Sequence, residues 1–315
     1  MKKTLILFLL VAVITGSNQI IVSASSDTPI PVTCDTEALT VKGNTSFEEY
    51  SVDKDVLSEK IKEIKTDMEG ESIDDTRARI EESVREEYEN DEQYLMQNAE
   101  NPSGAEEMIQ TIIDNRINRE KNLVNKDLSN SIGINSLAAN TSSKWSVSNP
   151  VIFKQSKTWN CGPASALIAI AGWNGYVKGS TNAKKMATLE TAMGSNSSDG
   201  TMVYKMVDVL NTYTSGYAYK KGSRLDSWDF MVSIEDSVAK DKAPILHAKT
   251  KYLDYYNGHN TGHYIAIVAD DSKYTTVTLH DTNRDDAYYG AHEVPMSQAH
   301  DAVSATERYL ISAAL

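Results

Sequence analysis

One cysteine of the sequence stands where a loop runs into a predicted helix, and a thiol in such a place can act as a nucleophile. Cys161 follows the loop residues 155–160 and precedes Gly162, Pro163 and an apolar helical pattern that reaches Trp173. The unpaired amides and the dipole of a helix N-terminus favour negative charge, so a thiolate forms there more easily than at the free-cysteine pKa of about 8.5. Gly162 permits a tight turn beside the sulfur, and Pro163 suits an early helical position. The pattern predicts nucleophilic catalysis by Cys161, although a small buried residue at a helix start would look the same.

Acyl transfer by a thiolate also needs hydrogen-bond donors for the negative charge that develops on the carbonyl oxygen. Gln155 lies six positions before Cys161. We expect its side-chain amide and the backbone N–H of Cys161 to supply these donors as an oxyanion hole. The alternative is that Gln155 is an ordinary loop residue.

The candidate general base comes from the C-terminal part of the chain, because all six histidines lie after residue 240. His263 opens an apolar run, 264–268, and Gly262 before it leaves room for a cleft. The following predicted strand ends at Asp281, whose carboxylate could accept the imidazole N–H and fix its tautomer if the two strands are neighbours. Structural roles remain the alternatives: a strand-end histidine for His263 and a turn former for Asp281.

Metal binding is an alternative interpretation of the histidines. His259 and His263 have a metal-like spacing, and Asp254 and His280 are not far away in sequence. Zinc needs convergent ligands held by the fold, and His259 lies in a loop rich in Tyr, Asn and Gly. We therefore predict no metal and see no signal for any other cofactor. The same loop, 252–260, either lines a substrate cleft or packs its aromatic rings, and His280 and His292 are read as structural.

The first residues predict export from the cell. Lys2 and Lys3 precede a short apolar run at 5–14, and small residues follow at 23–25. This is typical of a secretory signal peptide over residues 1–25, with an uncleaved anchor as the alternative. No later apolar run approaches the length of a membrane span, so we expect no membrane contact after cleavage. The mature protein is predicted to be secreted and extracellular, from a Gram-positive bacterium.

The sequence has only two cysteines, Cys34 and Cys161. Two cysteines do not make a disulfide framework, although pairing between them stays open. A chemical role for one of them is therefore at least as plausible as a structural one.

The net charge of −13 is concentrated in one segment. Residues 46–127 contain 24 acidic and 11 basic residues, and the remaining 20 acidic and 20 basic residues cancel. No basic track marks the C-terminal half, so nucleic acid is not an expected partner.

The acidic segment has helical spacing of its apolar residues, Leu57, Ile61, Ile64 and Met68 among them. Ser72 with Asp75 and Ser103 with Glu106 each resemble a capping box. The narrow apolar stripes predict weak independent stability. We favour a pro-segment over residues 26–125 that covers the cleft until it is removed; a solvated accessory region and a module for a partner protein are the alternatives.

The chain after this segment falls into a linker and a mixed domain. Residues 126–148 are rich in Ser, Asn and Ala, which is typical of an exposed linker. In residues 149–315 we predict helices at 162–173, 201–212 and 226–239 and strands at 243–250, 264–269, 274–280, 288–294 and 308–313. Helices followed by strands favour an α+β domain in which a helical lobe packs on an antiparallel sheet.

Three motifs together resemble a known family. They are the Gln six positions before "CGPAS", the later "GHYIAIVAD" and the strand ending in "HDT". This set is similar to that of secreted double-glycine-peptidase-like cysteine peptidases, papain-fold relatives of the peptidases that process bacteriocin leaders. The resemblance covers about residues 151–315. It implies a papain-like fold with Cys161 as nucleophile, Gln155 as oxyanion-hole donor, His263 as general base and Asp281 as the residue that orients it.

Two departures limit what the resemblance implies. No transporter is attached, so cleavage of bacteriocin leaders at Gly-Gly during export is not implied. Thr282 follows Asp281 where the family often has proline.

The sequence thus predicts a secreted cysteine peptidase that hydrolyses peptide bonds through a thioester, with a peptide or protein as substrate and the pro-segment as a possible intramolecular partner. A papain-fold binding or adhesion module without turnover is the alternative from another class. A cell-wall amidase or endopeptidase is the other enzymatic alternative, since that chemistry also uses Cys and His.

Overall fold

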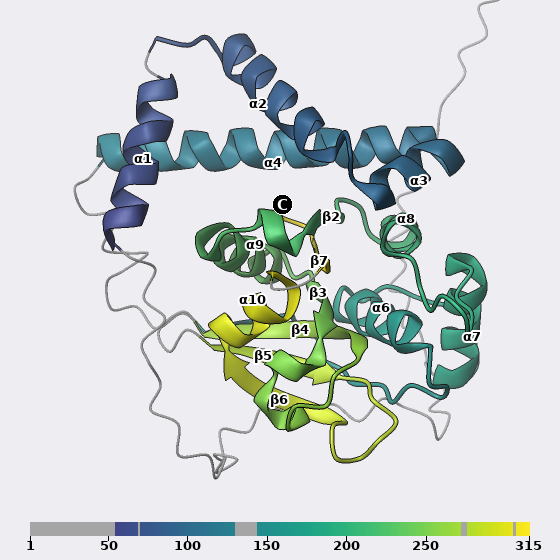
Figure 1. Cartoon of the computed structure of the whole chain (residues 1–315). Coiled ribbons are helices and arrows are strands. Elements are labelled where there is room, and N and C mark those ends of the chain that lie inside the picture. The colour runs from purple at the N-terminus through teal and green to yellow at the C-terminus, as the bar shows by residue number, and fades with distance from the viewer. Residues whose placement is uncertain (1–53, 69, 130–143, 272–275, 305–306) are drawn as a thin grey trace, which may run out of the picture.

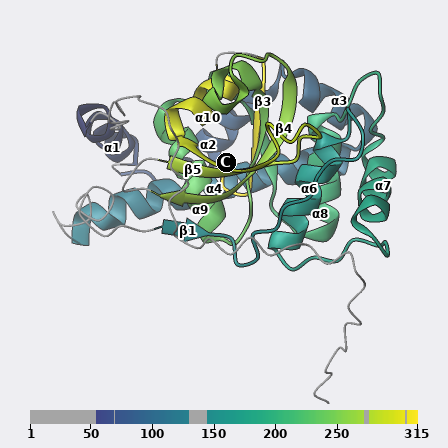
Figure 2. The same ribbon diagram turned by 90° about the horizontal axis from the view of Figure 1, so that it is seen from below.

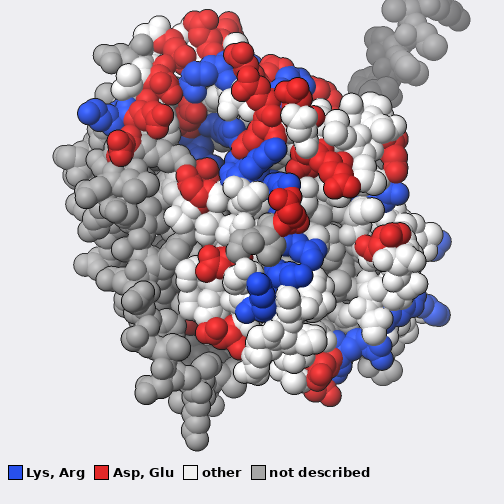
Figure 3. All heavy atoms as spheres, viewed as in Figure 1, with Lys and Arg blue, Asp and Glu red and all other residues white. Residues whose placement is uncertain are grey.

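The computed structural model describes residues 54–68, 70–129, 144–271, 276–304 and 307–315. Its N-terminal part is helical: α1 (Lys54–Met68), α2 (Ile73–Tyr88), α3 (Glu92–Glu100) and the long α4 (Pro102–Ser129). In Figure 1, α4 runs across the top of the molecule, and α1 and α2 lie against it. Acidic side chains gather over these helices in the space-filling view of Figure 3.

The ends of these helices partly follow the predicted capping. The Ser72 capping box is present, with the Asp75 amide bonded to the Ser72 hydroxyl. The second predicted box is wrong: α4 begins at Pro102, and Asn101 caps it by accepting the Gly104 amide at 3.2 Å. Proline at the first helical position has no N–H to satisfy, so the residue before it takes the capping role.

The C-terminal part is an antiparallel sheet with helices packed on it, which confirms the predicted α+β class. The helices are α6 (Cys161–Gly172), α7 (Asn182–Met193), α8 (Val203–Tyr213), α9 (Ser227–Ala239) and α10 (Met296–Ser304). The strands are β1 (Lys144–Ser146), β2 (Ala218–Lys221), β3 (Ile245–Lys249), β4 (Gly262–Asp271), β5 (Thr276–Asp281), β6 (Gly290–Pro295) and β7 (Tyr309–Ser312). Figures 1 and 2 both show α6, α7 and α8 grouped at one side of the sheet.

The strands follow the order β2-β7-β3-β4-β5-β6, with β1 paired to β4. β4 is therefore central: it pairs with β3, β5 and β1, all antiparallel. Its burial is nearly continuous from His263 to Asp270. A fully buried strand holds its side chains in fixed positions, which suits a residue that must meet a partner from another element.

Several elements differ from the sequence interpretation. The sequence patterns gave no prediction for α3, α7, α10 and β2, which are short or lack strong apolar periodicity. Part of the segment interpreted as a linker is regular structure, because α4 continues to Ser129 and β1 pairs with β4. The three-residue strand β1 has too few residues for an alternating pattern to reveal it. The predicted signal peptide and Cys34 lie outside the described residues.

The N-terminal helices share one apolar core with the sheet domain. Val84 of α2 and Ile109 and Ile112 of α4 are fully buried and belong to the same cluster as the strand residues. The Tyr88 hydroxyl donates to the carbonyl oxygen of Tyr219 in β2. The two parts are therefore packed as one structural unit in the described residues.

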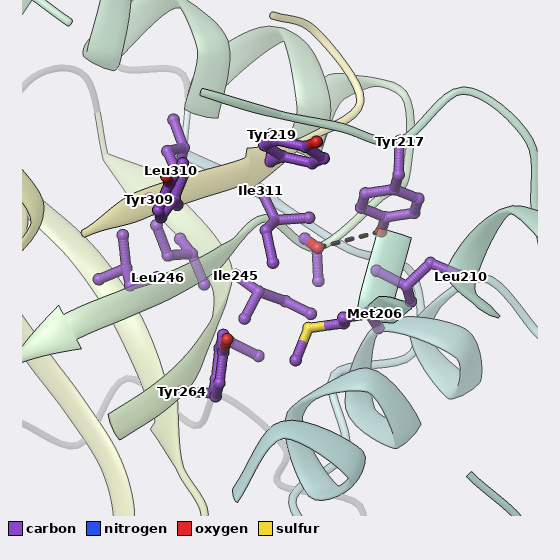
Figure 4. Close-up of a cluster of buried hydrophobic side chains, with 14 of the residues drawn as sticks. Met206, Leu210, Tyr217, Tyr219, Ile245, Leu246, Tyr264, Tyr309, Leu310 and Ile311 are labelled. Carbon is purple, nitrogen blue, oxygen red and sulfur yellow. Dashed lines mark hydrogen bonds between the residues drawn. The ribbon is translucent and has the colours of Figure 1, made fainter. Parts of the chain in front are cut away.

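Figure 4 shows a section of this core, in which Met206 of α8 points towards Ile245 of β3. The dashed line marks the hydrogen bond from the Tyr217 hydroxyl to the carbonyl oxygen of Ala243, at 3.0 Å. This bond satisfies a hydroxyl that the surrounding apolar side chains bury completely.

No helix in the described ranges is long and apolar enough to cross a membrane.

Candidate active site

Cys161 is the first residue of α6, as its loop-to-helix position predicts, and its thiol is free and partly buried. The loop before it is fixed by Asn160, whose side chain accepts the Lys157 amide at 2.9 Å and donates to Glu190 at 2.6 Å. Asn160 and Glu190 are both buried. The sulfur is thus held at a rigid helix start rather than on a loose loop.

Gly162 allows another loop to approach the helix start closely. A Cβ at Gly162 would lie 2.4 Å from the Thr201 hydroxyl oxygen and 3.0 Å from the methyl carbon of Met206. The main chain at Thr201 is held in turn by the Tyr264 hydroxyl, which donates to its carbonyl at 2.7 Å. The space at this helix start therefore favours glycine.

His263 is the second residue of β4 and is only 4% exposed. Its Nε2 lies 2.8 Å from Oδ1 of Asp281, the last residue of the neighbouring strand β5. The carboxylate accepts, so Nε2 carries the proton and Nδ1 is left for the thiol of Cys161, with which the ring also forms a hydrogen bond. The strand pairing expected from the sequence thus places thiol, imidazole and carboxylate in one chain of contacts.

Asp281 is fully buried and accepts hydrogen bonds on both carboxylate oxygens. Oδ1 also accepts the Asn283 amide at 2.9 Å, while Oδ2 accepts the hydroxyls of Tyr255 at 2.8 Å and Tyr256 at 2.7 Å. Counting His263, four donors face this carboxylate. A buried carboxylate with this many donors stays ionised.

The electrostatics favour a thiolate next to an imidazolium. Burial alone would raise the pKa of the Cys161 thiol, but the hydrogen bond and charge of His263, with backbone amides at Tyr264 and Gly162, bring it below the ordinary value. Burial alone would lower the pKa of His263, but the charge and hydrogen bond of Asp281 and the contact with Cys161 raise it. Each partner stabilises the charged form of the other.

The pair lies in a cleft of ≈ 560 Å³. One wall comes from β4 and the segment before β7, and another from the loop at Thr201. The corner between α2 and α3 also lines it, through Asn90, Glu92 and Gln93. The Gln93 side chain accepts the Val203 amide at 3.1 Å, which ties this corner to the cleft wall.

Residues 148–309 match a family model described as Peptidase_C39 like family, and this stretch covers about half of the chain. The chain belongs to this family.

A solved structure similar to the chain is titled as a double glycine motif protease from an AMS/PCAT transporter in complex with the leader peptide. The identity is 16%, the match covers 51% of this chain and 89% of that one, and the TM-score is 0.32. Among curated proteins, none matches the chain.

In this C39-like chain, Gln155 is buried close to the carboxylate end of the site. Its backbone amide donates to the carbonyl of Thr282 at 2.7 Å, and its side-chain oxygen accepts the Thr282 hydroxyl at 3.3 Å. Its side-chain nitrogen donates to the carbonyl of Lys157 at 2.8 Å. One of the two amide hydrogens of the Gln155 side chain is therefore engaged within the loop.

Two histidines of the metal alternative, His259 and His280, have other contacts in the structure. In the described part of the chain, no group of three or more His, Cys, Asp or Glu side chains is arranged to hold a metal ion. His259 instead stacks on Tyr288 with ring centroids 5.8 Å apart, and Nδ1 of His280 lies 2.7 Å from the Val151 carbonyl oxygen.

The side chains that support Asp281 are not apparent from the sequence. The loop 252–260 is predicted to line a substrate cleft or to pack its aromatic rings, and in the structure its Tyr255 and Tyr256 donate hydrogen bonds directly to Asp281. Two adjacent tyrosines in a loop are a weak sequence signal, because only the fold turns both hydroxyls towards one carboxylate.

Proposed function

We propose that this C39-like chain is a cysteine peptidase that hydrolyses peptide bonds through a thioester intermediate. The observation that carries the proposal is the chain of contacts from Cys161 at a helix start through His263 to the ionised Asp281, with Cys161 and His263 both lining a cleft. Nucleophile, base and orienting carboxylate in this order are the parts that acyl transfer needs.

The reaction follows from the protonation states. The Cys161 thiolate attacks the carbonyl carbon, and the backbone N–H of Cys161 with the Gln155 amide stabilises the oxyanion. Nδ1 of the His263 imidazolium gives its proton to the leaving amine as the C–N bond breaks, which leaves a thioester. His263, now neutral, takes a proton from water; hydroxide attacks the thioester, the acid leaves, and the thiolate and imidazolium are restored.

The decisive test is the pH dependence of iodoacetamide alkylation of the full chain, with modification of Cys161 followed by peptide mass mapping. A lowered thiol pKa predicts fast labelling near pH ~6, well below the free-thiol pKa of about 8.5. His263→Ala should abolish this fast labelling. His259→Ala removes an exposed histidine of the adjacent loop and should leave it unchanged.

Slow labelling that rises only near the free-thiol pKa, equal in wild type and His263→Ala, would exclude the peptidase and favour a binding module. If the thiolate is present, Cys161→Ala on peptidoglycan zymograms separates a cell-wall amidase or endopeptidase from a peptidase of other proteins.

The packing of the acidic helices fits an accessory region better than a removable pro-segment. They contribute fully buried side chains to the common core, and they border the cleft while Cys161 stays partly exposed. We propose that they remain attached after export, with residues 1–25 as the signal peptide. Mass measurement of the secreted protein tests this: loss of everything before about residue 149 would restore the pro-segment interpretation.

A further inference from the structure

The active-site cleft contains a cation that no carboxylate neutralises among the described residues. Arg308 immediately precedes β7 and lines the same cleft as Cys161 and His263. Its side chain is half-buried, and no ion pair joins it to a described Asp or Glu. A guanidinium has five N–H donors and no acceptor, so such a group is ready to bind an anion.

A neutral histidine fixes this guanidinium. Nη1 of Arg308 lies 2.5 Å from Nε2 of His247, whose ring stacks on Tyr264 with centroids 4.5 Å apart and an angle of 13°. Tyr309 lies parallel on the same histidine at 6.4 Å, and Figure 4 shows both tyrosines. Burial, then the charges of Arg308 and His263, lower the pKa of His247 to about 3. The ring therefore accepts a hydrogen bond from Arg308 without cancelling its charge.

The position of the guanidinium links it to the catalytic histidine. A Cβ added to Gly262 would lie 2.8 Å from Nη2 and 3.0 Å from Nη1 of Arg308. The guanidinium thus rests against the backbone of the residue that precedes His263. Glycine at this position leaves the space that brings the positive charge so close to the site.

The other charges at the cleft do not take this role. Lys221 lines the cleft too, but it is paired with Glu307. Glu92 and Asp199 also line the cleft and form no ion pair with Arg308 in the described structure. Lys221 therefore offers a natural comparison: a cation in the same cleft whose charge is already matched.

We propose that Arg308, held by His247, forms a subsite for a carboxylate of the peptide substrate close to the scissile bond. The carboxylate has two possible sources, an acidic side chain within the peptide or the free C-terminus of a short one. The inference rests on the proposed peptidase function and adds the substrate class. A planar guanidinium can bind a carboxylate with two parallel hydrogen bonds, which gives geometric selection as well as attraction.

The test compares peptides that the wild-type protein cleaves, made in pairs with Glu or Gln at each position around the cleaved bond. We expect one position at which Glu raises kcat/KM by about tenfold over Gln, as expected for a charge-assisted hydrogen bond. Arg308→Gln should remove this preference. Peptides with a free C-terminus or a C-terminal amide form the second arm: a preference that follows the terminus identifies that source instead of the side chain.

Two variants show whether position as well as charge matters. Gly262→Ala keeps the charge of Arg308 but displaces its flexible guanidinium, so it should also reduce the preference. Lys221→Gln makes the same charge change as Arg308→Gln, on the cation that Glu307 already pairs, and should leave the preference in place. Equal loss in both charge variants, or no loss in Arg308→Gln, would overturn the subsite.

Alkylation separates failure of the subsite from failure of the peptidase proposal. Iodoacetamide labelling of Cys161 reports the thiolate and should stay fast in Arg308→Gln. Fast labelling and peptide cleavage without any Glu or terminal preference would refute the subsite alone. Absence of fast labelling in the wild type would refute the peptidase.

Discussion

Two buried aspartates lie at opposite ends of the β4–β5 pair and differ in their hydrogen-bond partners and in the direction of their pKa shifts. Asp281, at the end beside His263, accepts four hydrogen bonds, and its pKa is lowered. Asp270, at the other end, is 1% exposed, has no hydrogen-bond partner for either oxygen in the described residues, and its pKa is raised to about 7. Burial raises both pKa values, so the donors decide the charge.

Hydrogen-bond donors distinguish the buried carboxylate that stays ionised from the one whose pKa is raised. A carboxylate that must stay negative at neutral pH needs donors placed by several segments: here a strand, the loop 252–260 and the turn at Asn283. Asp270 has Glu235 and Asp271 as charged neighbours, and both raise its pKa further. It carries no comparable support and is expected to be neutral over much of the acidic range.

The largest expected effect comes from removing the supported carboxylate. Asp281→Ala leaves His263 without the charge that raises its pKa, so the thiolate–imidazolium pair should collapse. We expect peptide hydrolysis to fall by roughly 100-fold or more, in the range of a lost acid–base function. Labelling of Cys161 near pH ~6 measures the same loss without a substrate. Unchanged labelling would show that Asp281 is only structural.

A smaller effect is expected from the tyrosine pair. Hydrogen bonds from Tyr256 and Tyr255 help to lower the pKa of Asp281, so the double variant Tyr255→Phe/Tyr256→Phe should raise it. Asp281 then becomes protonated at higher pH, and the acidic limb of the Cys161 labelling profile should move upward by about one pH unit. A general loss of rate without a shift of that limb would contradict positioning by the hydroxyls.

The same pair also contributes to stability, with a defined sign. Because the pKa of Asp281 is depressed in the folded state, its contribution is present above the unfolded-state pKa near 3.8 and is lost as the pH falls through the folded pKa. Urea unfolding of wild type and the double variant should therefore differ at pH 7 and converge in acid. A difference that stays constant with pH would assign the effect to lost packing.

The smallest effect is expected at the unsupported aspartate, and it has the opposite sign. Asp270 has a raised folded pKa, so its stabilising neutral form is present below the unfolded value and is lost as the pH rises towards about 7. Asp270→Asn should reduce this fall in the free energy of unfolding and stabilise the protein at pH 8 by about 1 kcal/mol. Burial also raises the pKa of Glu235 to about 7, so the free energy of unfolding of the variant should still fall somewhat as the pH rises. Destabilisation at pH 8 would indicate that Asp270 is charged and supported.

Local patterns predicted the backbone positions of the central residues well. A helix after Cys161, a strand after His263 and a strand ending at Asp281 follow from short apolar runs, and adjacent strands commonly pair. The structure brings His263 and Asp281 together as that pairing requires. The catalytic roles themselves stay predictions until they are measured.

Side-chain support was beyond the sequence because it depends on long-range geometry. Arg308 and His247 are 61 residues apart and meet only because β7 pairs with β3. Likewise, the Gln155 side-chain oxygen and the Thr282 hydroxyl that donates to it are 127 residues apart. Residue types alone do not fix the register of two paired strands, and a shift of one residue would turn the side chains of a strand such as β3 to the other face of the sheet.

The bond between Tyr88 and the Tyr219 carbonyl spans 131 residues, and this separation bears on when the chain acquires its shape. The acidic helices emerge from the ribosome long before the strands that complete their core. Contacts of such long range form slowly and leave apolar faces open in the meantime. Because Arg308 and Tyr309 line the cleft, the cleft can be assembled only after β7 has been synthesised.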